Sequence, residues 1–188
     1  MRTIEIAVLL GSGRRQGNSE AAVEAILSGL SIPGDEVERF YLNEMNVGHC
    51  QACEACRENG GICVQTDNMD IIYDVLGSAD LVLIATPIYF SGPSSLLKQV
   101  IDRCQCLWAR NSPMPEDRWA ALVTVSGQKG ANFRNTQSIV RSFVNSVPLQ
   151  WAGEFQLPGF DEEEALESDP ATLAKAELFG RELSEKIR

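Results

Sequence analysis

Residues 4–19 read IEIAVLLGSGRRQGNS, an apolar run that enters a glycine-rich turn and then a polar helix start. The run from Arg2 to Leu10 predicts a buried strand because most of its later side chains are apolar. Asn18 or Ser19 can cap a helix, and an apolar stripe at helical spacing follows, up to the stop at Pro33-Gly34. The stretch therefore predicts the strand, turn and helix that open an α/β fold.

Strands and helices alternate along the rest of the chain. Predicted strands are Glu36–Leu42, Leu81–Ala85, Ala120–Val125 and Gln150–Gln156, and predicted helices are Asp67–Leu76, Pro93–Cys104, Thr136–Ser146 and Asp169–Ile187. The near-continuous apolar run at Leu81–Ala85 is typical of a central parallel strand. With right-handed crossovers, this alternation predicts a three-layer α/β sandwich around a five-stranded parallel sheet with the flavodoxin-like strand order 2-1-3-4-5. We expect a single domain over residues 1–188, with a cysteine-containing insertion at about residues 46–66.

Composition and charge exclude two classes of partner. The chain has 188 residues, 44% of them hydrophobic, and a formal net charge of −10. Nucleic-acid backbones and anionic membranes attract basic surfaces, so we expect neither as a partner. The acidic run Asp161-Glu162-Glu163-Glu164 is interpreted as a solvated turn. The first residues lack the pattern of a signal peptide, and we expect a cytoplasmic protein.

The glycine turn at residues 11–19 is predicted to bind a phosphate group. In open α/β sheets ligands lie at the carboxyl ends of the strands, where free N–H groups and the dipole of the following helix attract an anion. Glycine allows close approach of the backbone, neutral side chains donate hydrogen bonds, and Arg14 can add a charge-assisted bond. The candidate contacts are Ser12, Arg14, Gly17, Asn18 and Ser19. The spacing fits neither a Walker motif nor G-x-G-x-x-G, so a mononucleotide is favoured, and the alternative is a capped turn without a ligand.

Four of the six cysteines, Cys50, Cys53, Cys56 and Cys63, lie within fourteen residues. Gaps of two residues bring thiolates close enough to share an iron–sulfur cluster or a tetrahedral metal ion, and Gly60-Gly61 lets the chain turn back toward the last of them. In a reducing compartment, clustered cysteines more often bind metal or act in redox chemistry than form disulfides. Reduced packing thiols, zinc and a regulatory disulfide are the alternatives. The cysteines at positions 104 and 106 are interpreted as packing thiols.

Two loops resemble those of a known family. The pattern Gly11-Ser12-x-Arg14-x-x-Gly17-Asn18-Ser19 resembles the phosphate loop of NAD(P)H-dependent FMN reductases, and Thr86-Pro87-Ile88-Tyr89-Phe90 resembles their second flavin loop. The resemblance covers the first two thirds of the chain. It implies that the FMN phosphate lies on the first loop and the isoalloxazine ring beside the second. The residues expected at the ring are Pro87, Ile88, Tyr89 and Phe90. For Tyr89 and Phe90 the alternative is core packing at a strand end.

The turn Ser126-Gly127-Gln128-Lys129-Gly130 follows the fourth predicted strand. The resemblance implies that this turn is the third loop at the ring. It departs from the double glycine common in the family, so only Ser126 and Gly127 are carried over as contacts. A plain surface turn is the alternative.

The cysteine spacing resembles the compact motif of iron–sulfur flavoproteins, a branch of the same flavodoxin-like group. In that branch four cysteines hold a [4Fe–4S] cluster, which implies the same role for the four clustered cysteines here. The whole resemblance implies an FMN-dependent oxidoreductase with NAD(P)H as electron donor. Its electrons would pass to the cluster or to a small-molecule or ferredoxin-type acceptor. Hydride transfer to a flavin needs no side-chain acid or base, so no catalytic residue is assigned.

Two alternatives of function stay open. One is an electron carrier that exchanges electrons with ferredoxin and has no nicotinamide activity, and the other is a zinc-stabilised binding module. The insertion lies between the second strand and the next helix, where it could cover the flavin of a neighbouring subunit. We therefore expect a homodimer or homotetramer.

Overall fold

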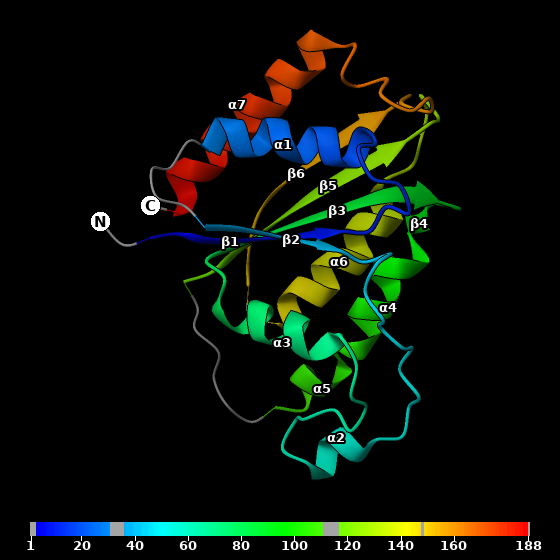
Figure 1. Cartoon of the computed structure of the whole chain (residues 1–188), viewed down its shortest axis with the longest axis vertical. Coiled ribbons are helices and arrows are strands. Elements are labelled where there is room, and N and C mark those ends of the chain that lie inside the picture. The colour runs from blue at the N-terminus through cyan, green and yellow to red at the C-terminus, as the bar shows by residue number, and fades with distance from the viewer. Residues whose placement is uncertain (1–2, 31–35, 111–116, 148, 188) are drawn as a thin grey trace.

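The computed structural model describes residues 3–30, 36–110, 117–147 and 149–187. A central sheet is covered by helices on both of its faces (Figure 1). Five parallel strands are hydrogen-bonded in the order β2-β1-β3-β5-β6, and the short strand β4 pairs antiparallel with β3. Among the parallel strands this is the predicted order 2-1-3-4-5, and the flavodoxin-like fold is confirmed.

Every predicted strand and helix is present. The strands are β1 (Glu5–Leu10), β2 (Glu36–Tyr41), β3 (Leu81–Tyr89), β4 (Gly92–Pro93), β5 (Trp119–Ser126) and β6 (Gln150–Pro158). The helices are α1 (Asn18–Leu30), α2 (Ala55–Glu58), α3 (Met69–Ser78), α4 (Ser95–Arg103), α5 (Gln105–Trp108), α6 (Arg134–Ser146) and α7 (Pro170–Ile187). The predicted strand start at Arg2 and the predicted helix stop at Pro33-Gly34 lie outside the described residues.

Three short elements and a four-residue extension of β3 were not predicted, and the other described ends differ from the prediction by no more than two residues. The elements β4, α2 and α5 have two, four and four residues, too few for a periodic sequence pattern. Strand β3 continues past its predicted end at Ala85 because its last two residues pair with Gly92-Pro93 in a hairpin. The hydroxyl of Thr86 accepts a hydrogen bond from the N–H of Ser94 at 3.0 Å, which ties the hairpin to the start of α4.

Helices α1 and α7 cover one face of the sheet, and α3, α4 and α6 cover the other (Figure 1). Successive strand residues point to opposite faces, so that Val8 and Leu9 are both fully buried but in different cores. A Cβ atom on Gly29 of α1 would lie 1.9 Å from the carbonyl oxygen of Glu177 in α7. Glycine at this position therefore allows the close contact between the two helices.

The fold brings the three predicted loops to one edge of the sheet. Strands β1, β3 and β5 are parallel neighbours, so their carboxyl ends lie together. The segment between β2 and α3, which contains the four clustered cysteines, extends past α4 and α5 on the α3, α4 and α6 side of the sheet (Figure 1). In the described residues, every helix is too short or too polar to span a membrane.

Candidate functional site

A cavity of about 120 Å³ lies at the carboxyl ends of β1, β3 and β5. All three predicted loops contribute to its wall. The predicted residues that line it are Ser12, Arg14, Gly17, Asn18, Ser19, Pro87, Ile88, Tyr89, Ser126 and Gly127. Ligand pockets usually measure roughly 300–1,000 Å³. This cavity is therefore too small to enclose a whole mononucleotide; it has room for a phosphate group, and a ring system would lie over its apolar wall.

The first loop presents free backbone donors to the cavity. The N–H groups of Glu20 and Ala21 both donate to the carbonyl of Gly17, at 2.9 and 3.0 Å. This leaves the first two N–H groups of α1, those of Asn18 and Ser19, without a hydrogen bond to the described residues. Both residues are buried, and a first-turn N–H group at the positive end of the helix dipole favours an anion.

The side chain of Asn18 has a partner that sequence analysis did not predict. Its Nδ2 donates to the carbonyl of Glu162 at 2.8 Å, and its Oδ1 accepts the N–H of Leu166 at 2.9 Å. Asn18 therefore holds the segment at residues 160–166 against the start of α1. Its backbone N–H, rather than its side chain, is the group available to a ligand.

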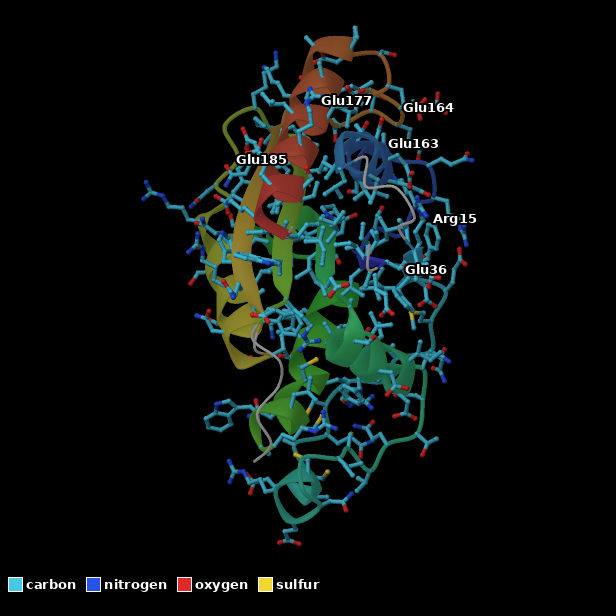
Figure 2. All side chains as sticks on the ribbon, turned by 90° about the vertical axis from the view of Figure 1, so that its left-hand side faces the viewer. Arg15, Glu36, Glu163, Glu164, Glu177 and Glu185 are labelled. Atoms are coloured by element: carbon cyan, nitrogen blue, oxygen red, sulfur yellow. The ribbon has the colours of Figure 1, made fainter. Side chains whose placement is uncertain are left out.

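The segment that Asn18 holds brings carboxylates to the cavity. Asp161 and Glu163 line it, and Glu163 Oε1 lies 3.3 Å from Arg14 Nε. Glu163 and its neighbour Glu164 lie on the loop above α1 (Figure 2). The acidic run was interpreted as a solvated turn, and no local pattern in it distinguishes a carboxylate beside an anion site from any other exposed carboxylate. The only signal is its position after the last strand, at the same sheet edge as the other loops.

The second loop forms an exposed apolar wall. Tyr89 is 57% exposed and Phe90 is fully exposed, which removes core packing as the explanation for these aromatic side chains. Phe90 and Ser91 have positive φ angles of 50° and 64°, as the tight hairpin between β3 and β4 requires. Phe90, although predicted as a contact, does not line the cavity. The part of this loop that lines the cavity is thus Pro87, Ile88 and Tyr89.

The third loop packs against the acidic segment. The carbonyl of Ser126 accepts N–H groups from Gly159 and Phe160 at 2.7 and 3.0 Å, and the Ser126 hydroxyl accepts the N–H of Gln128 at 3.2 Å. A Cβ atom on Gly127 would lie 2.4 Å from Asp161 Oδ1, so any other residue here would displace the Asp161 side chain. The loop is therefore held in place by the segment that follows β6.

A second cavity, of about 400 Å³, is lined by all four clustered cysteines and by Cys106. The four clustered thiols are partly or fully exposed, and all six cysteines are free. Among the described residues, no three His, Cys, Asp or Glu side chains form a group that could hold a metal ion. Cys106 was interpreted as a packing thiol. It is buried, and burial raises the pKa of its thiol, yet the residue lines this cavity.

Comparison with known proteins gives consistent matches. Residues 4–155 match the family described as NADPH-dependent FMN reductase. An iron–sulfur flavoprotein of Methanosarcina thermophila is 31% identical over 136 residues, which cover 72% of this chain and 71% of that protein. Iron–sulfur flavoprotein MJ0731 of Methanocaldococcus jannaschii is 32% identical over 119 residues, which cover 63% of this chain and 60% of that protein.

Solved structures share the fold at low sequence identity. An NAD(P)H:quinone oxidoreductase from Methanothermobacter marburgensis has a TM-score of 0.73 and 17% identity, with 97% of this chain and 98% of that chain covered. A flavone reductase has a TM-score of 0.74 and 19% identity, with 97% of this chain and 62% of that chain covered. In both the flavone reductase and MJ0731, the aligned region covers less than two thirds of the relative's own length.

Proposed function

The chain belongs to the NADPH-dependent FMN reductase family of flavin oxidoreductases, and on this premise we propose that it transfers electrons from NADH or NADPH through FMN to an acceptor. The observation that carries the proposal is the convergence of three separate loops on one cavity. One end of that cavity offers free N–H groups and the other an apolar wall. This is the pair of surfaces that a flavin phosphate and a flavin ring require.

The phosphate end is assigned to the first loop. The N–H groups of Asn18 and Ser19, at the N-terminus of α1, donate to the phosphate. The Ser12 hydroxyl and the Arg14 guanidinium add side-chain donors. Arg14 is already paired with Glu163, so phosphate binding exchanges one anionic partner of Arg14 for another. The acidic segment therefore competes with the phosphate and sets its affinity.

The ring end is assigned to the second and third loops. Pro87, Ile88 and Tyr89 provide the apolar wall, and Ser126 and Gly127, at the end of the neighbouring strand β5, line the same cavity. When bound, FMN supplies the acceptance of a hydride and the release of electrons one at a time. The residues of the chain bind and orient the flavin and do not transfer a proton. The single histidine, His49, belongs to the cysteine segment and does not line this cavity.

The cysteine segment is proposed to hold a [4Fe–4S] cluster through Cys50, Cys53, Cys56 and Cys63. Four thiols on one cavity of about 400 Å³ have the donor chemistry and the room for such a cluster, which would supply one-electron transfer. Closing a cluster requires the thiols to turn toward one point, because no metal-binding group is formed among the described side chains. Relatives at about 31% identity that are named iron–sulfur flavoproteins support the proposal.

The partners are proposed to be a small-molecule or ferredoxin-type electron acceptor and further copies of this chain. Large apolar side chains stay exposed on the cysteine segment, on α5 and on the β3–β4 hairpin. They are Ile62, Val64, Trp108 and Phe90. Exposed apolar side chains of this size support a homodimer or homotetramer in which the cysteine segment covers a neighbouring flavin. Light scattering of the FMN-loaded protein tests this, and a monomer at high concentration would contradict it.

A second candidate function is an electron carrier that exchanges electrons with ferredoxin and has no nicotinamide activity. The observation behind it is that the iron–sulfur flavoprotein relatives are named for two redox groups and not for a nicotinamide donor. Steady-state oxidation of NADH and NADPH by the FMN-loaded protein separates the two candidates. Turnover with either nucleotide supports the reductase, whereas no turnover together with rapid reduction by ferredoxin supports the carrier.

A further inference from the structure

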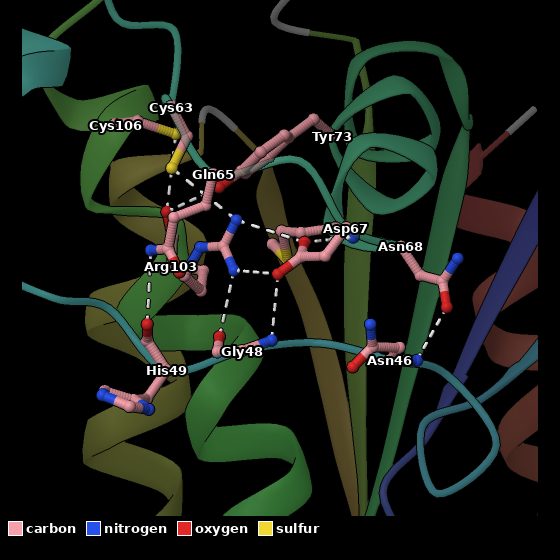
Figure 3. A network of polar contacts seen from close by, with 11 residues as sticks. Asn46, Gly48, His49, Cys63, Gln65, Asp67, Asn68, Tyr73, Arg103 and Cys106 are labelled. Atoms are coloured by element: carbon pink, nitrogen blue, oxygen red, sulfur yellow. Dashed lines mark hydrogen bonds and ion pairs between the residues drawn. The ribbon is translucent and has the colours of Figure 1, made fainter.

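Arg103, the last residue of α4, lies buried between the two ends of the cysteine segment (Figure 3). Its side chain is 1% exposed, and that of its ion-pair partner Asp67 is 9% exposed. A buried guanidinium is costly unless several of its donors find acceptors. The acceptors of Arg103 therefore show what the side chain holds in place.

Those acceptors come from both ends of the segment. Arg103 Nη1 donates to the carbonyl of Gly48 at 3.0 Å and to Asp67 Oδ2 at 2.5 Å. Arg103 Nη2 donates to Asp67 Oδ1 at 3.2 Å and to the sulfur of Cys63 at 3.6 Å. Asp67 in turn accepts the N–H of Gly48 at 2.9 Å. One guanidinium thus connects Gly48, just before the first clustered cysteine, with Cys63, the last clustered cysteine, and with the carboxylate of Asp67.

The backbone of Arg103 is fixed on its other side. Its carbonyl accepts the hydroxyl of Tyr73 at 2.9 Å and the thiol of Cys106 at 3.4 Å. Arg103 also lines the cavity that contains the clustered thiols. Its carboxylate partner lies on one side of the guanidinium, and Nη2 reaches a sulfur on the other (Figure 3). A donor beside a cysteine ligand is a means by which a protein tunes an iron–sulfur centre.

We propose that Arg103 is a positioning residue that fixes both ends of the cysteine segment on α4 and directs a charged N–H donor at the sulfur of Cys63. The segment has unusual local geometry, with positive φ angles at Ala52 and Glu54, so its own backbone preferences do not explain its conformation. The role toward a cluster rests on the proposed function. The positioning of Cys63 does not, because it is a property of the protein without iron.

The test compares three variants in iron-free protein loaded with FMN. Arg103→Met combined with Asp67→Leu removes the pair without leaving a buried charge unpaired, a replacement that folds tolerate well. Arg103→Lys keeps the charge but cannot reach all of the acceptors. Arg57→Gln is the matched control, because Arg57 lines the same cavity but is 60% exposed and forms an ion pair with the nearby Glu54.

The readout is the rate at which a maleimide labels each cysteine, measured by peptide mapping, with the exposed Cys53 as the internal reference. We expect labelling of Cys63 to accelerate by about tenfold or more in the double variant, because the segment loses its attachment and opens locally. Arg57→Gln should match the wild type. Unchanged labelling of Cys63 in a double variant that still binds FMN would overturn the proposal.

Three further outcomes also decide parts of the proposal. If the double variant failed to bind FMN, Arg103→Lys would decide, since an intermediate acceleration supports positioning and a wild-type rate overturns it. If the wild type bound iron after anaerobic reconstitution, the cluster in Arg103→Lys should have a more negative reduction potential than in the wild type, and an equal potential would exclude the tuning role. If the wild type bound no iron, the cluster proposal would fail while the labelling result still decided the role of Arg103.

Discussion

Replacing Glu163 with glutamine is expected to tighten FMN binding, although the substitution removes the ion-pair partner of Arg14. Arg14 Nε lies 3.3 Å from Glu163 Oε1, and the two side chains are 62% and 68% exposed. Solvent screens such a pair, which is worth about 0.2–1 kcal/mol. A phosphate that binds Arg14 must replace Glu163, and the freed carboxylate then repels the phosphate. In water, that repulsion is about 1 kcal/mol for two unit charges 4 Å apart.

Glutamine at position 163 removes both the ion pair that the phosphate must replace and the repulsion between the freed carboxylate and the phosphate. The expected gain is about 0.5–1.5 kcal/mol, or a roughly 2- to 12-fold lower Kd. Titration of the protein with FMN, followed by the quenching of flavin fluorescence, measures it. The gain should shrink as salt is raised, because ionic screening weakens both terms. In an Arg14→Ala background, the part of the gain that comes from the Arg14–Glu163 pair should disappear.

Glu164→Gln is the matched control for this prediction. It removes the same charge one residue away, from a side chain that does not line the cavity. Its effect on Kd should be clearly smaller. An unchanged or weaker FMN affinity in Glu163→Gln would refute the placement of the phosphate beside Arg14. An equal gain in FMN affinity in both variants would show that the effect comes from the net charge and not from the position of Glu163.

Three further predictions follow from individual contacts. Cys53→Ser should abolish iron and acid-labile sulfide binding after anaerobic reconstitution and leave FMN binding intact; retained iron at the wild-type level would remove Cys53 from the ligand set. Burial raises the pKa of Asp67, but hydrogen bonds from Arg103, Gly48 and Met69 outweigh it, so the net shift is downward from the ordinary value of 3.8. The stability that comes from this lowered pKa is present at neutral pH and is lost as pH falls below the ordinary value. The free energy of urea unfolding should therefore depend less on acid pH in Asp67→Asn than in the wild type, and the variant should be less stable at neutral pH by about 3–5 kcal/mol. Parallel pH profiles of the two proteins would contradict this. Gly29→Ala should lower the free energy of unfolding by about 1–3 kcal/mol or more, because its Cβ would overlap the Glu177 carbonyl; an unchanged melting temperature would contradict the close α1–α7 contact.

Much of the fold could be predicted because it depends on local patterns. Apolar runs and helical stripes identify the strands and helices, and their alternation leaves few topologies for a parallel sheet. The extension of β3 could not be predicted, since it depends on a hairpin with β4, which has only two residues. Hydrophobic periodicity gives no signal over so short a stretch.

The lining of the candidate cavity was predictable where a loop directly follows a strand and not where distant segments meet. The three loops were identified because their positions follow from the strand order. The role of Asn18 in holding the acidic segment depends on contacts with residues more than 140 positions later in the chain. Likewise, the burial of Arg103 depends on Asp67, 36 positions earlier. An arginine at the end of an amphipathic helix has the same local pattern whether it is exposed or buried.

The most direct test of the flavin proposal is an anaerobic titration of the FMN-loaded protein with NADH and with NADPH, followed by the visible flavin spectrum. Free FMN at the same concentration is the control. We predict that the chain binds FMN and that at least one nucleotide bleaches the bound flavin stoichiometrically, much faster than it reduces free FMN. A protein that binds no FMN, or bound FMN whose spectrum neither nucleotide changes, would contradict the proposal.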